Sequence, residues 1–350
     1  MINSNGARSP GRRLHFVGTM PQFDVPGDAF DFQLKELEGS VRRLSGGETG
    51  PRLAWFVPLV KELKTGPKIR ATREGDWTDY DDVDRLAVRR GQRLTVQDVP
   101  LHLAEWAEAE LAVLDEAGTP ATAERPLQVG IPSYLDLALF IFGPSGALRT
   151  AGVLLDAITA QVERIVALAG DRVVIQVETP AAAIAVASLP APLRKAAAEA
   201  LGRLVLRQIR RAPHGTRLGM HLCLGDMGHK ARVTPASAAP LVSLTNVLTR
   251  RWPEGRELEF VHLPLCGGQQ PPSLDPAFYA PLRELRIPSA VHLVAGIAHE
   301  DGSVEDQREV RDTVERETGA QVDIATACGL GRRSGEQAER AVERMRALLS

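Results

Sequence analysis

The 350-residue sequence is poor in cysteine, with only Cys223, Cys266 and Cys328. Three dispersed cysteines do not build the disulfide framework of a small secreted protein, and a chain of this length can bury a core without one. Each of the three stands near the end of a short apolar run. We therefore interpret them as free thiols or metal ligands.

The sequence also lacks an excess of charge and a long apolar segment. Its 42 basic and 44 acidic residues give a net charge of -2, which argues against nucleic acid or an anionic membrane as a partner. No run approaches the roughly 18 apolar residues of a membrane span, and the first residues, MINSNGARSPGRR, lack the apolar core of a secretory signal. These absences predict a cytoplasmic protein.

What the sequence does contain is the composition of an ordinary globular protein, 44% hydrophobic and 25% charged. We expect residues 1–12 to form a disordered leader, because they are polar and show no apolar pattern. Residues 13–350 are expected to form one domain, since barrels of alternating strands and helices often occupy this length.

Short apolar runs alternate with helical patterns through most of the chain. Strands are expected at 14–18, just before Glu48, and at 127–131, 172–177, 217–223, 258–263, 290–297 and 322–327. Helices are expected at 28–44, 100–117, 151–169, 192–211, 236–250, 303–318 and 335–349. This alternation predicts a single (β/α)8 TIM barrel. Residues 51–125 form a long insertion after the second strand, which we expect to serve as a lid or wall.

The active site of such a barrel lies at the carboxyl ends of its strands. His221 and Cys223 stand at the end of the fifth strand, two residues apart, so their side chains share a face. Imidazole and thiolate are ligands that Zn²⁺ prefers, and Cys328 at the end of the eighth strand offers a third. The pattern favours a zinc site, although buried cysteines are also common as small core residues.

Six segments, in this order, resemble the catalytic barrel of cobalamin-independent methionine synthase and its relatives. They are VGTMPQ (17–22), GGETGPR (46–52), IQVETP (175–180), HLCLGD (221–226), VAGIAHEDGSVED (294–306) and ACGLGRR (327–333). They span nearly the whole chain, and the specific part is the CGL segment together with the preceding His-X-Cys. Relatives include epoxyalkane:coenzyme M transferase and, more distantly, the uroporphyrinogen decarboxylase barrel.

The resemblance implies a zinc enzyme that moves a methyl or other alkyl group onto a small thiol. His221, Cys223 and Cys328 match the metal ligands of the family. A free thiol is largely protonated at neutral pH, and coordination to zinc makes it a thiolate without a separate base.

The resemblance also implies the residues that hold the thiol substrate. Glu48 matches a glutamate that receives the amino group of homocysteine, and Glu178 takes the place of an aspartate that faces the same amino acid. Thr19, which follows Gly18 at the end of the first strand, stands where the family has a serine. Glu48 and Glu178 are thus the expected catalytic residues, and Gly18, Thr19 and the two glutamates the expected substrate contacts.

The sequence departs from the family pattern at three places. The glutamate ligand at the end of the sixth strand is absent, so His262 is expected as the fourth ligand, with Cys266 as the alternative. Glu178-Thr179 replaces a pair of acidic residues, which alters the amino-acid pocket. Nothing precedes the barrel in place of the synthase's amino-terminal half, so the alkyl donor, a folate or a corrinoid, stays open.

Two other functions remain open at this point. The protein could join a thiol to an epoxide, as epoxyalkane:coenzyme M transferase does, or it could be a barrel without catalysis that serves as a binding protein. Several residues have two interpretations as well. Glu48 could cap a helix, and His262 and Cys266 could be core residues.

The aromatic and basic residues near the predicted site are equally open. Trp77, Trp106 and Tyr134 either line the substrate mouth or pack in the core. Arg332 and Arg333 follow Cys328 and either meet an anionic substrate or are solvated at the start of the last helix.

Overall fold

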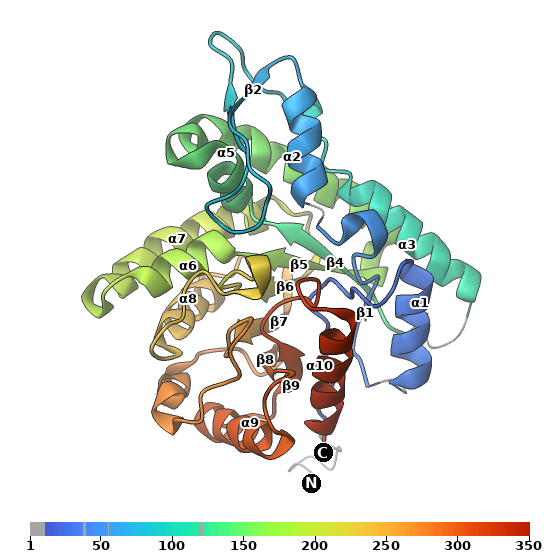
Figure 1. Ribbon diagram of the computed structural model, residues 1–350, viewed down its shortest axis with the longest axis vertical. Coiled ribbons are helices and arrows are strands. Elements are labelled where there is room, and N and C mark those ends of the chain that lie inside the picture. Colours follow the sequence, from blue (N-terminus) through green and yellow to red (C-terminus); the bar gives the residue numbers. More distant parts are fainter. Residues whose placement is uncertain (1–10, 38–39, 55, 119–121, 123) are drawn as a thin grey trace.

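A computed structural model describes residues 11–37, 40–54, 56–118, 122 and 124–350. Over these residues the chain is a mixed α/β fold around a curled sheet of seven parallel strands (Figure 1). The strand order follows the chain: β1 (Leu44–Ser45), β4 (Leu127–Pro132), β5 (Val173–Glu178), β6 (Arg217–His221), β7 (Glu257–Pro264), β8 (His292–Ala298) and β9 (Asp323–Thr326). Because all neighbours are parallel, their carboxyl ends meet at one edge.

The described residues form seven strands in this sheet rather than the eight expected. The strand predicted at 14–18 is reduced to isolated parallel bridges that Leu14 makes with Val41 and with Ile324. The backbone N–H of His15 donates to the carbonyl oxygen of Ile324 at 2.9 Å, on the β9 side. Residues 14–18 therefore lie between the two edge strands of the sheet, but only Leu14 forms β-bridges with its neighbours.

Helices surround the sheet, and five of the expected ones are confirmed to within a few residues. The longer helices are α2 (Phe56–Thr65), α3 (Leu103–Ala117), α5 (Tyr134–Ala169), α6 (Pro180–Ser188), α7 (Ala191–Arg211), α8 (Ala239–Arg250), α9 (Val304–Thr318) and α10 (Gly335–Ala347). Short helical turns lie at Gly50–Arg52, Val96–Asp98, Gly170–Arg172, Met227–His229, Pro276–Phe278 and Ala280–Glu284. Ser303 and Ser334 cap the starts of α9 and α10.

The helix expected at 28–44 is wrong over its second half. The helix α1 (Pro26–Asp31) continues only as one π-helical turn, η1 (Phe32–Glu36). Leu44, which helical spacing had assigned to the same helix, lies in β1 and pairs with Leu127. A short helix followed closely by a buried strand spaces its apolar residues much as one long helix would, so periodicity does not separate the two.

The helix α5 is longer than the one expected at 151–169. The side chain of Ser133 caps it by accepting a hydrogen bond from the N–H of Leu135, and Gly143 (φ 66°) with Pro144 breaks it into two parts. By length and composition, the stretch Tyr134–Arg172 is apolar enough to cross a membrane, with 33% of its most apolar window buried. One helix of this kind is weak evidence for a membrane span, because the core helix of a soluble protein meets the same criteria.

The insertion forms a separate layer above the carboxyl edge of the sheet. After α2 comes an antiparallel hairpin of β2 (Ile69–Arg73) and β3 (Arg85–Val88), and α3 then returns to pack on α5. Figure 1 shows α2 and the hairpin beside α5, projecting at the top of the molecule. The expected position of the insertion is thus confirmed, although α3 belongs to the helical layer around the sheet.

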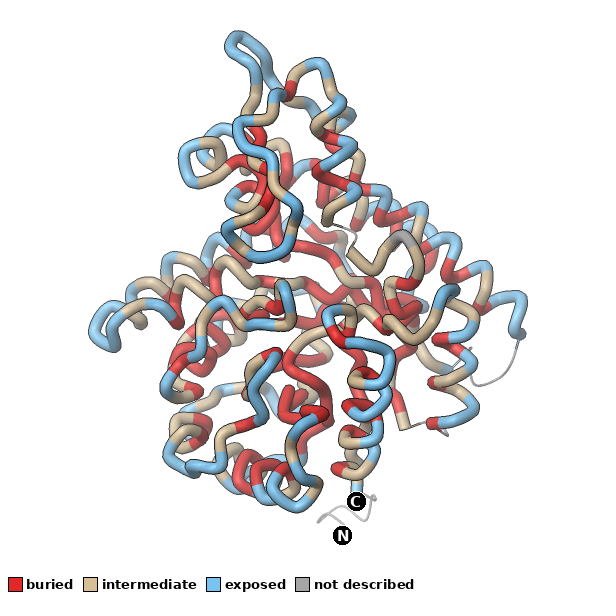
Figure 2. The backbone as a smooth tube through the Cα atoms, viewed as in Figure 1, coloured by how far each residue is buried: buried red, intermediate tan, exposed pale blue. Residues whose placement is uncertain are grey.

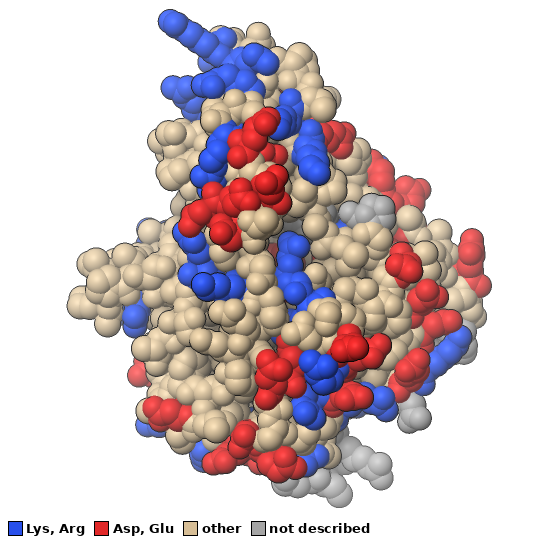
Figure 3. All heavy atoms as spheres, viewed as in Figure 1, with Lys and Arg blue, Asp and Glu red and all other residues tan. Residues whose placement is uncertain are grey.

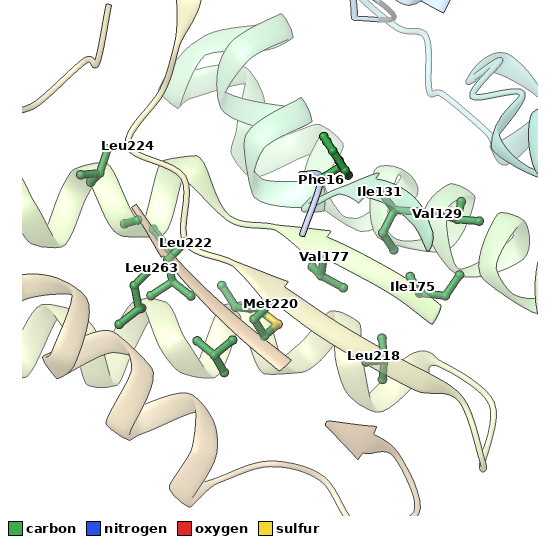
Figure 4. Close-up of a cluster of buried hydrophobic side chains, with 14 of the residues drawn as sticks. Phe16, Val129, Ile131, Ile175, Val177, Leu218, Met220, Leu222, Leu224 and Leu263 are labelled. Carbon is green, nitrogen blue, oxygen red and sulfur yellow. The ribbon is translucent and has the colours of Figure 1, made fainter. Parts of the chain in front are cut away.

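Side chains on the outer face of the strands form the core beneath the helices, whereas side chains on the inner face point toward the inside of the curl. Alternate residues such as Val129, Ile175 and Met220 point to the helices and are buried there (Figure 4), and Figure 2 shows the same buried centre under an exposed helical surface. The residues between them face the inside of the curl. A small cluster of Val17, Val174, Phe260, Val294 and Ala325 fills that inside.

The leader expected at 1–12 falls mostly outside the described residues, which begin at residue 11. Arg12 is described and held in place. Its guanidinium donates two hydrogen bonds of 2.9 Å, one to each carboxylate oxygen of Glu315 on α9. The expectation of disorder therefore does not extend to Arg12.

Candidate active site

Three chemically active side chains lie in one row at the carboxyl edge of the sheet. Glu178 ends β5 and is in register with His221, which ends β6 and is in register with His262 of β7. All three are on the inward face, because the strands alternate and their neighbours Val177 and Met220 face the helices. The sequence-based placement of these residues at strand ends is correct.

His221, Cys223 and Cys328 come together, with one ligand atom from each within 4.8 Å of the others. The strand β6 ends at His221, so Cys223 lies in the loop that follows rather than on the strand as expected. The two sulfur atoms are 3.7 Å apart. This contact, followed by burial, raises the pKa of the Cys328 thiol well above its ordinary value.

The hydrogen bonds of His262 determine which nitrogen of His221 is free. Nε2 of His262 lies 3.0 Å from the carbonyl oxygen of Thr326, which can only accept, so this nitrogen carries the proton. Nδ1 of the neutral His262 ring is then an acceptor, and Nδ1–H of His221 donates to it at 2.6 Å. The Nε2 lone pair of His221 is buried without a partner among the described residues.

Burial keeps both imidazole rings neutral. It lowers the pKa of His262 to about 3 and the pKa of His221 well below its ordinary value. A neutral histidine that presents an unpartnered nitrogen beside two cysteine sulfurs is the donor set that zinc prefers. The residues at this place therefore fit a zinc ion.

The two residues expected as a fourth ligand do not join this group. His262 uses both ring nitrogens in the hydrogen bonds just described. The Cys266 thiol donates instead to the carbonyl oxygen of Gly296 at 3.3 Å, and burial raises its pKa to about 12. The described residues thus offer three ligands side by side.

Glu48 lines the same cavity as Cys223 and Cys328 and has an unusual backbone conformation. Its φ of 44° is in the left-handed region, which is rare for a residue with a side chain and occurs mainly where function requires it. The Thr19 hydroxyl donates to its Oε2 at 2.7 Å. A Cβ atom on Gly18 would lie 3.1 Å from the same carboxylate, so a glycine there leaves room for Glu48.

Glu178 faces Glu48 across Gly130, where an added Cβ would lie 3.3 Å from Glu48 Oε1 and 3.5 Å from Glu178 Oε1. Burial and the nearby carboxylates of Glu48 and Asp136 raise the pKa of Glu178 to about 8. Asp136, on the first turn of α5, is buried, and burial raises its pKa to about 7. Three acidic groups therefore share one cavity.

The cavity that contains these groups has an empty volume of about 1120 Å³, including its open mouth. Its floor is polar and carries the residues expected from the sequence. Its upper wall is apolar and comes largely from the insertion and from α5, with Phe56, Trp77, Tyr80 and Phe140 among its lining residues. Trp106 and Tyr134, the other aromatic candidates, do not line it.

Sequence reasoning missed Asp136, although it follows the end of β4 as closely as other candidates follow their strands. It also missed a second group, in which the Glu300 carboxylate accepts from Arg333 Nε at 2.8 Å and contacts His229 Nε2 at 3.0 Å. His299 stands beside them, with its ring nitrogens bound to backbone groups of Gly268 and Asp301. This second group is linked internally by ion pairs, so we assign it a structural role.

Comparison with known proteins finds relatives of this fold only among solved structures. No family model matches the chain, and no curated protein matches it. The B12-independent methionine synthase from Shewanella sp. W3-18-1, solved in complex with selenomethionine, superposes with a TM-score of 0.62 at 13% identity, over 97% of this chain and 96% of that one.

Two further structures agree with this fold. A candidate vitamin-B12-independent methionine synthase from Listeria monocytogenes has a TM-score of 0.51 at 13% identity, over 92% of this chain and 86% of that one. A methyltransferase from Methanosarcina mazei has a TM-score of 0.51 at 13% identity, over 97% and 95%. The resemblance noted in the sequence is thus confirmed at the level of the fold.

Proposed function

We propose that this protein is a zinc-dependent transferase that moves a methyl or other alkyl group onto a small thiol. The observation that carries the proposal is the group of His221, Cys223 and Cys328 at the floor of a cavity. The fold is the one found in B12-independent methionine synthases and in a methyltransferase. The proposal includes one domain over residues 13–350, in which residues 14–18 complete the seven-stranded sheet to a barrel of eight strands. It also includes a cytoplasmic location.

The spacing of the two sulfur atoms supports zinc as the metal. Two thiolates at Zn–S distances of 2.3 Å in a tetrahedron stand about 3.8 Å apart. Cys223 and Cys328 already have their sulfurs 3.7 Å apart, a ring nitrogen of His221 lies within 4.8 Å of both, and Nε2 of His221 has no hydrogen-bond partner among the described residues. Zinc bound there would act as the Lewis acid that keeps a thiol substrate deprotonated at neutral pH.

We propose that His262 positions His221 instead of acting as a fourth ligand. Catalytic zinc sites commonly use three protein ligands and leave the fourth position to water or substrate. A histidine ligand is usually fixed by a hydrogen bond from its other ring nitrogen, and His262 supplies that acceptor. The fourth position would then belong to the sulfur of the thiol substrate.

The acidic floor would bind the rest of the thiol substrate. Glu48 and Glu178 face the same space, and Thr19 fixes one oxygen of Glu48. An ammonium group of an aminothiol placed between the carboxylates would lower the pKa of Glu178 and replace repulsion with attraction. These contacts would orient the sulfur for attack, with Gly18 leaving space for the Glu48 carboxylate.

Metal analysis and thiol alkylation test the proposal together. Protein purified without chelator should hold about one zinc per chain, and Cys223→Ser and Cys328→Ser should lose both zinc and activity. Cys266→Ser is the matched control and should keep both. Zinc-free wild-type protein with full activity would reject the proposal.

The same assay decides between alkyl donors. Homocysteine and other small thiols would be incubated with methyltetrahydrofolate, methylcobalamin or an epoxide, and the thioether product identified by mass. Methyl transfer is the expected result. Epoxide opening without methyl transfer would favour the alternative function. Zinc binding with no thioether from these donors or from methyl onium donors would favour a binding protein.

A further inference from the structure

The upper wall of the cavity carries four aromatic rings that are close to one another. The Phe56 ring is 5.6 Å from the ring of Trp77 and 5.4 Å from that of Phe140, and Tyr80 is 6.5 Å from Phe140, measured between ring centroids. All four residues line the cavity. They come from α2, the loop of the hairpin and α5, so three separate segments contribute to one aromatic wall.

Two of these residues are held in ways that argue for a role beyond core packing. Trp77 has a φ of 61°, a left-handed conformation that costs a bulky residue free energy and persists where the surroundings enforce it. The Tyr80 hydroxyl donates to the carbonyl oxygen of Lys230 at 3.2 Å and accepts from the N–H of Met227 at 3.0 Å. The hairpin loop is thereby tied to the loop that carries Cys223.

A buried carboxylate lies at the base of the aromatic wall. Asp136 precedes Phe140 by one helical turn, so the two side chains lie on the same face of α5. One oxygen of Asp136 accepts a hydrogen bond from the N–H of Ala181, and hydrogen bonds from Ser133 also lower the pKa of this carboxyl against the larger effect of burial. Oδ2 is buried and makes no hydrogen bond of good geometry with the described residues. An unpartnered carboxylate oxygen in a cavity calls for a cationic or hydrogen-bonding ligand.

The charges around the cavity favour a cation. Arg332 is the basic residue among the described lining residues, whereas four are acidic: Glu48, Asp136, Glu178 and Asp226. Burial raises the pKa values of Asp136 and Glu178, and a bound cation would favour their ionised forms. Figure 3 shows acidic side chains gathered on the hairpin loop above the cavity. That loop has the sequence EGDWTDYDDVD (74–84), and its surface charge would draw a cation toward the mouth.

We propose that the aromatic wall and Asp136 bind the alkyl donor as a small methyl onium ion, either a sulfonium or a quaternary ammonium. Aromatic faces attract such cations through the ring quadrupole, and a nearby carboxylate adds charge attraction. The Tyr80 ring already takes part in one such contact, with the guanidinium of Arg232, which is not a lining residue, 5.3 Å from the ring centroid. This inference rests on the proposed alkyl transfer and specifies its donor.

An onium donor also suits the charge balance of the reaction. The thiolate sulfur of the substrate gives an electron pair to the methyl carbon and forms the S–C bond. The bond from that carbon to the onium atom breaks, and its electron pair stays on the leaving sulfide or tertiary amine, which departs neutral. The step needs no proton and no further reactant. No acid is therefore needed near the aromatic wall to protonate the leaving group.

Ligand binding to the zinc-loaded full-length protein tests the inference without reference to activity. The probes are trimethylsulfonium and choline, and 3,3-dimethyl-1-butanol is the uncharged analogue of choline. Calorimetry measures the dissociation constant of each. Each cation should bind about 3- to 30-fold more tightly than the alcohol. Phe140→Leu and Asp136→Asn should remove most of that preference, while Phe278→Leu and Asp115→Asn, which lie away from the cavity, should keep it.

Equal binding of the alcohol and the two cations would overturn the inference and leave an apolar pocket of another specificity. If Phe140→Leu fails to fold, Phe140→Tyr keeps a ring and should keep the preference. A second measurement uses deuterated methyl groups in each onium donor with homocysteine, and the mass of the thioether tells sulfonium from ammonium. Loss of zinc from wild-type protein would reject the proposed function, whereas intact zinc and thiol alkylation without onium preference would reject only the donor.

Discussion

Nδ1 of His221 lies 2.6 Å from Nδ1 of His262, and the carbonyl oxygen of Thr326, on the other side of His262, determines that His221 is the donor. A chain of hydrogen bonds that begins at the backbone of β9 thus selects the tautomer of a residue on β6. The consequence is a free Nε2 on His221, a residue with a ring nitrogen within 4.8 Å of the two cysteine sulfurs. The tautomer of His221, the proposed zinc ligand, is therefore fixed by the protein alone.

Replacing His262 should weaken zinc binding without removing it. His262→Phe removes the acceptor for Nδ1–H of His221, and the loss of such a supporting hydrogen bond typically weakens metal affinity 10- to 100-fold. His262→Gln keeps an oxygen that can accept this bond and should recover most of the affinity. Competition with a chelator measures the affinity, with His292→Gln as the control. Equal weakening by Phe and Gln would contradict the positioning role.

Gly219 should not tolerate a side chain. It is in register with Phe260 on β7, and a Cβ atom at this position would overlap the Phe260 ring. Gly219→Ala should lower the free energy of unfolding by about 1–3 kcal/mol through overpacking. Adding Phe260→Leu should return part of the loss, while Gly335→Ala, whose Cβ would meet open space, should change little. Urea denaturation of wild type, these variants and Phe260→Leu alone is the measurement, and additive losses in the double variant would argue against the overlap.

The fold was predictable where short apolar segments alternated with helical patterns and helix starts carried capping residues. The strands β5 to β9 are short, mostly apolar segments between helical segments, and α9 and α10 begin at serine caps. The strand expected just before Glu48 is present as β1, but prediction failed for the strand at 14–18 and for the second half of the helix at 28–44, where pairing depends on partners far along the chain. Leu14 contacts Ile324, and Leu44 contacts Leu127, and neither neighbour can be inferred from the local pattern.

The site was predictable to the extent that it lies at strand ends. Glu178, His221 and Cys328 were found because a parallel sheet brings such ends together. The hydrogen bonds of His262 were not predictable, because a sequence does not contain their directions. Phe56 and Tyr80 were missed for a related reason, since their meeting with Phe140 depends on how the insertion folds back.

The hydroxyl of Thr19 should matter more than its methyl group. Thr19→Val keeps the shape but removes the donor to Glu48 Oε2, a hydrogen bond to a charged group. Such a bond contributes about 1.5–3 kcal/mol, so KM for the thiol should rise roughly tenfold or more. Thr19→Ser keeps the donor and should stay within a few-fold of wild type. The test is steady-state kinetics of thiol alkylation, and similar KM values for the two variants would show that the hydroxyl does not act through Glu48.

Glu178 should make the metal-free protein less stable as pH rises. Burial and the neighbouring Glu48 and Asp136 raise its pKa to about 8 from an ordinary 4.5. Below pH 4.5 the carboxyl group is protonated in both the folded and the unfolded chain, so the free energy of unfolding has its full value there with respect to this group. Between pH 4.5 and 8 the unfolded chain releases the proton while the folded chain retains it, so the stabilisation is lost as pH rises through this window.

One such group changes the free energy of unfolding by at most about 1.4 kcal/mol per pH unit, and solvent in the cavity reduces that slope. Glu178→Gln is neutral at every pH and should flatten the dependence between pH 5 and 8, while Glu309→Gln on α9 should leave the dependence unchanged. Urea denaturation in the presence of a chelator, repeated across this range, measures the slope. A slope as steep in Glu178→Gln as in wild type would place the titrating group elsewhere, with Asp136 as the next residue to replace.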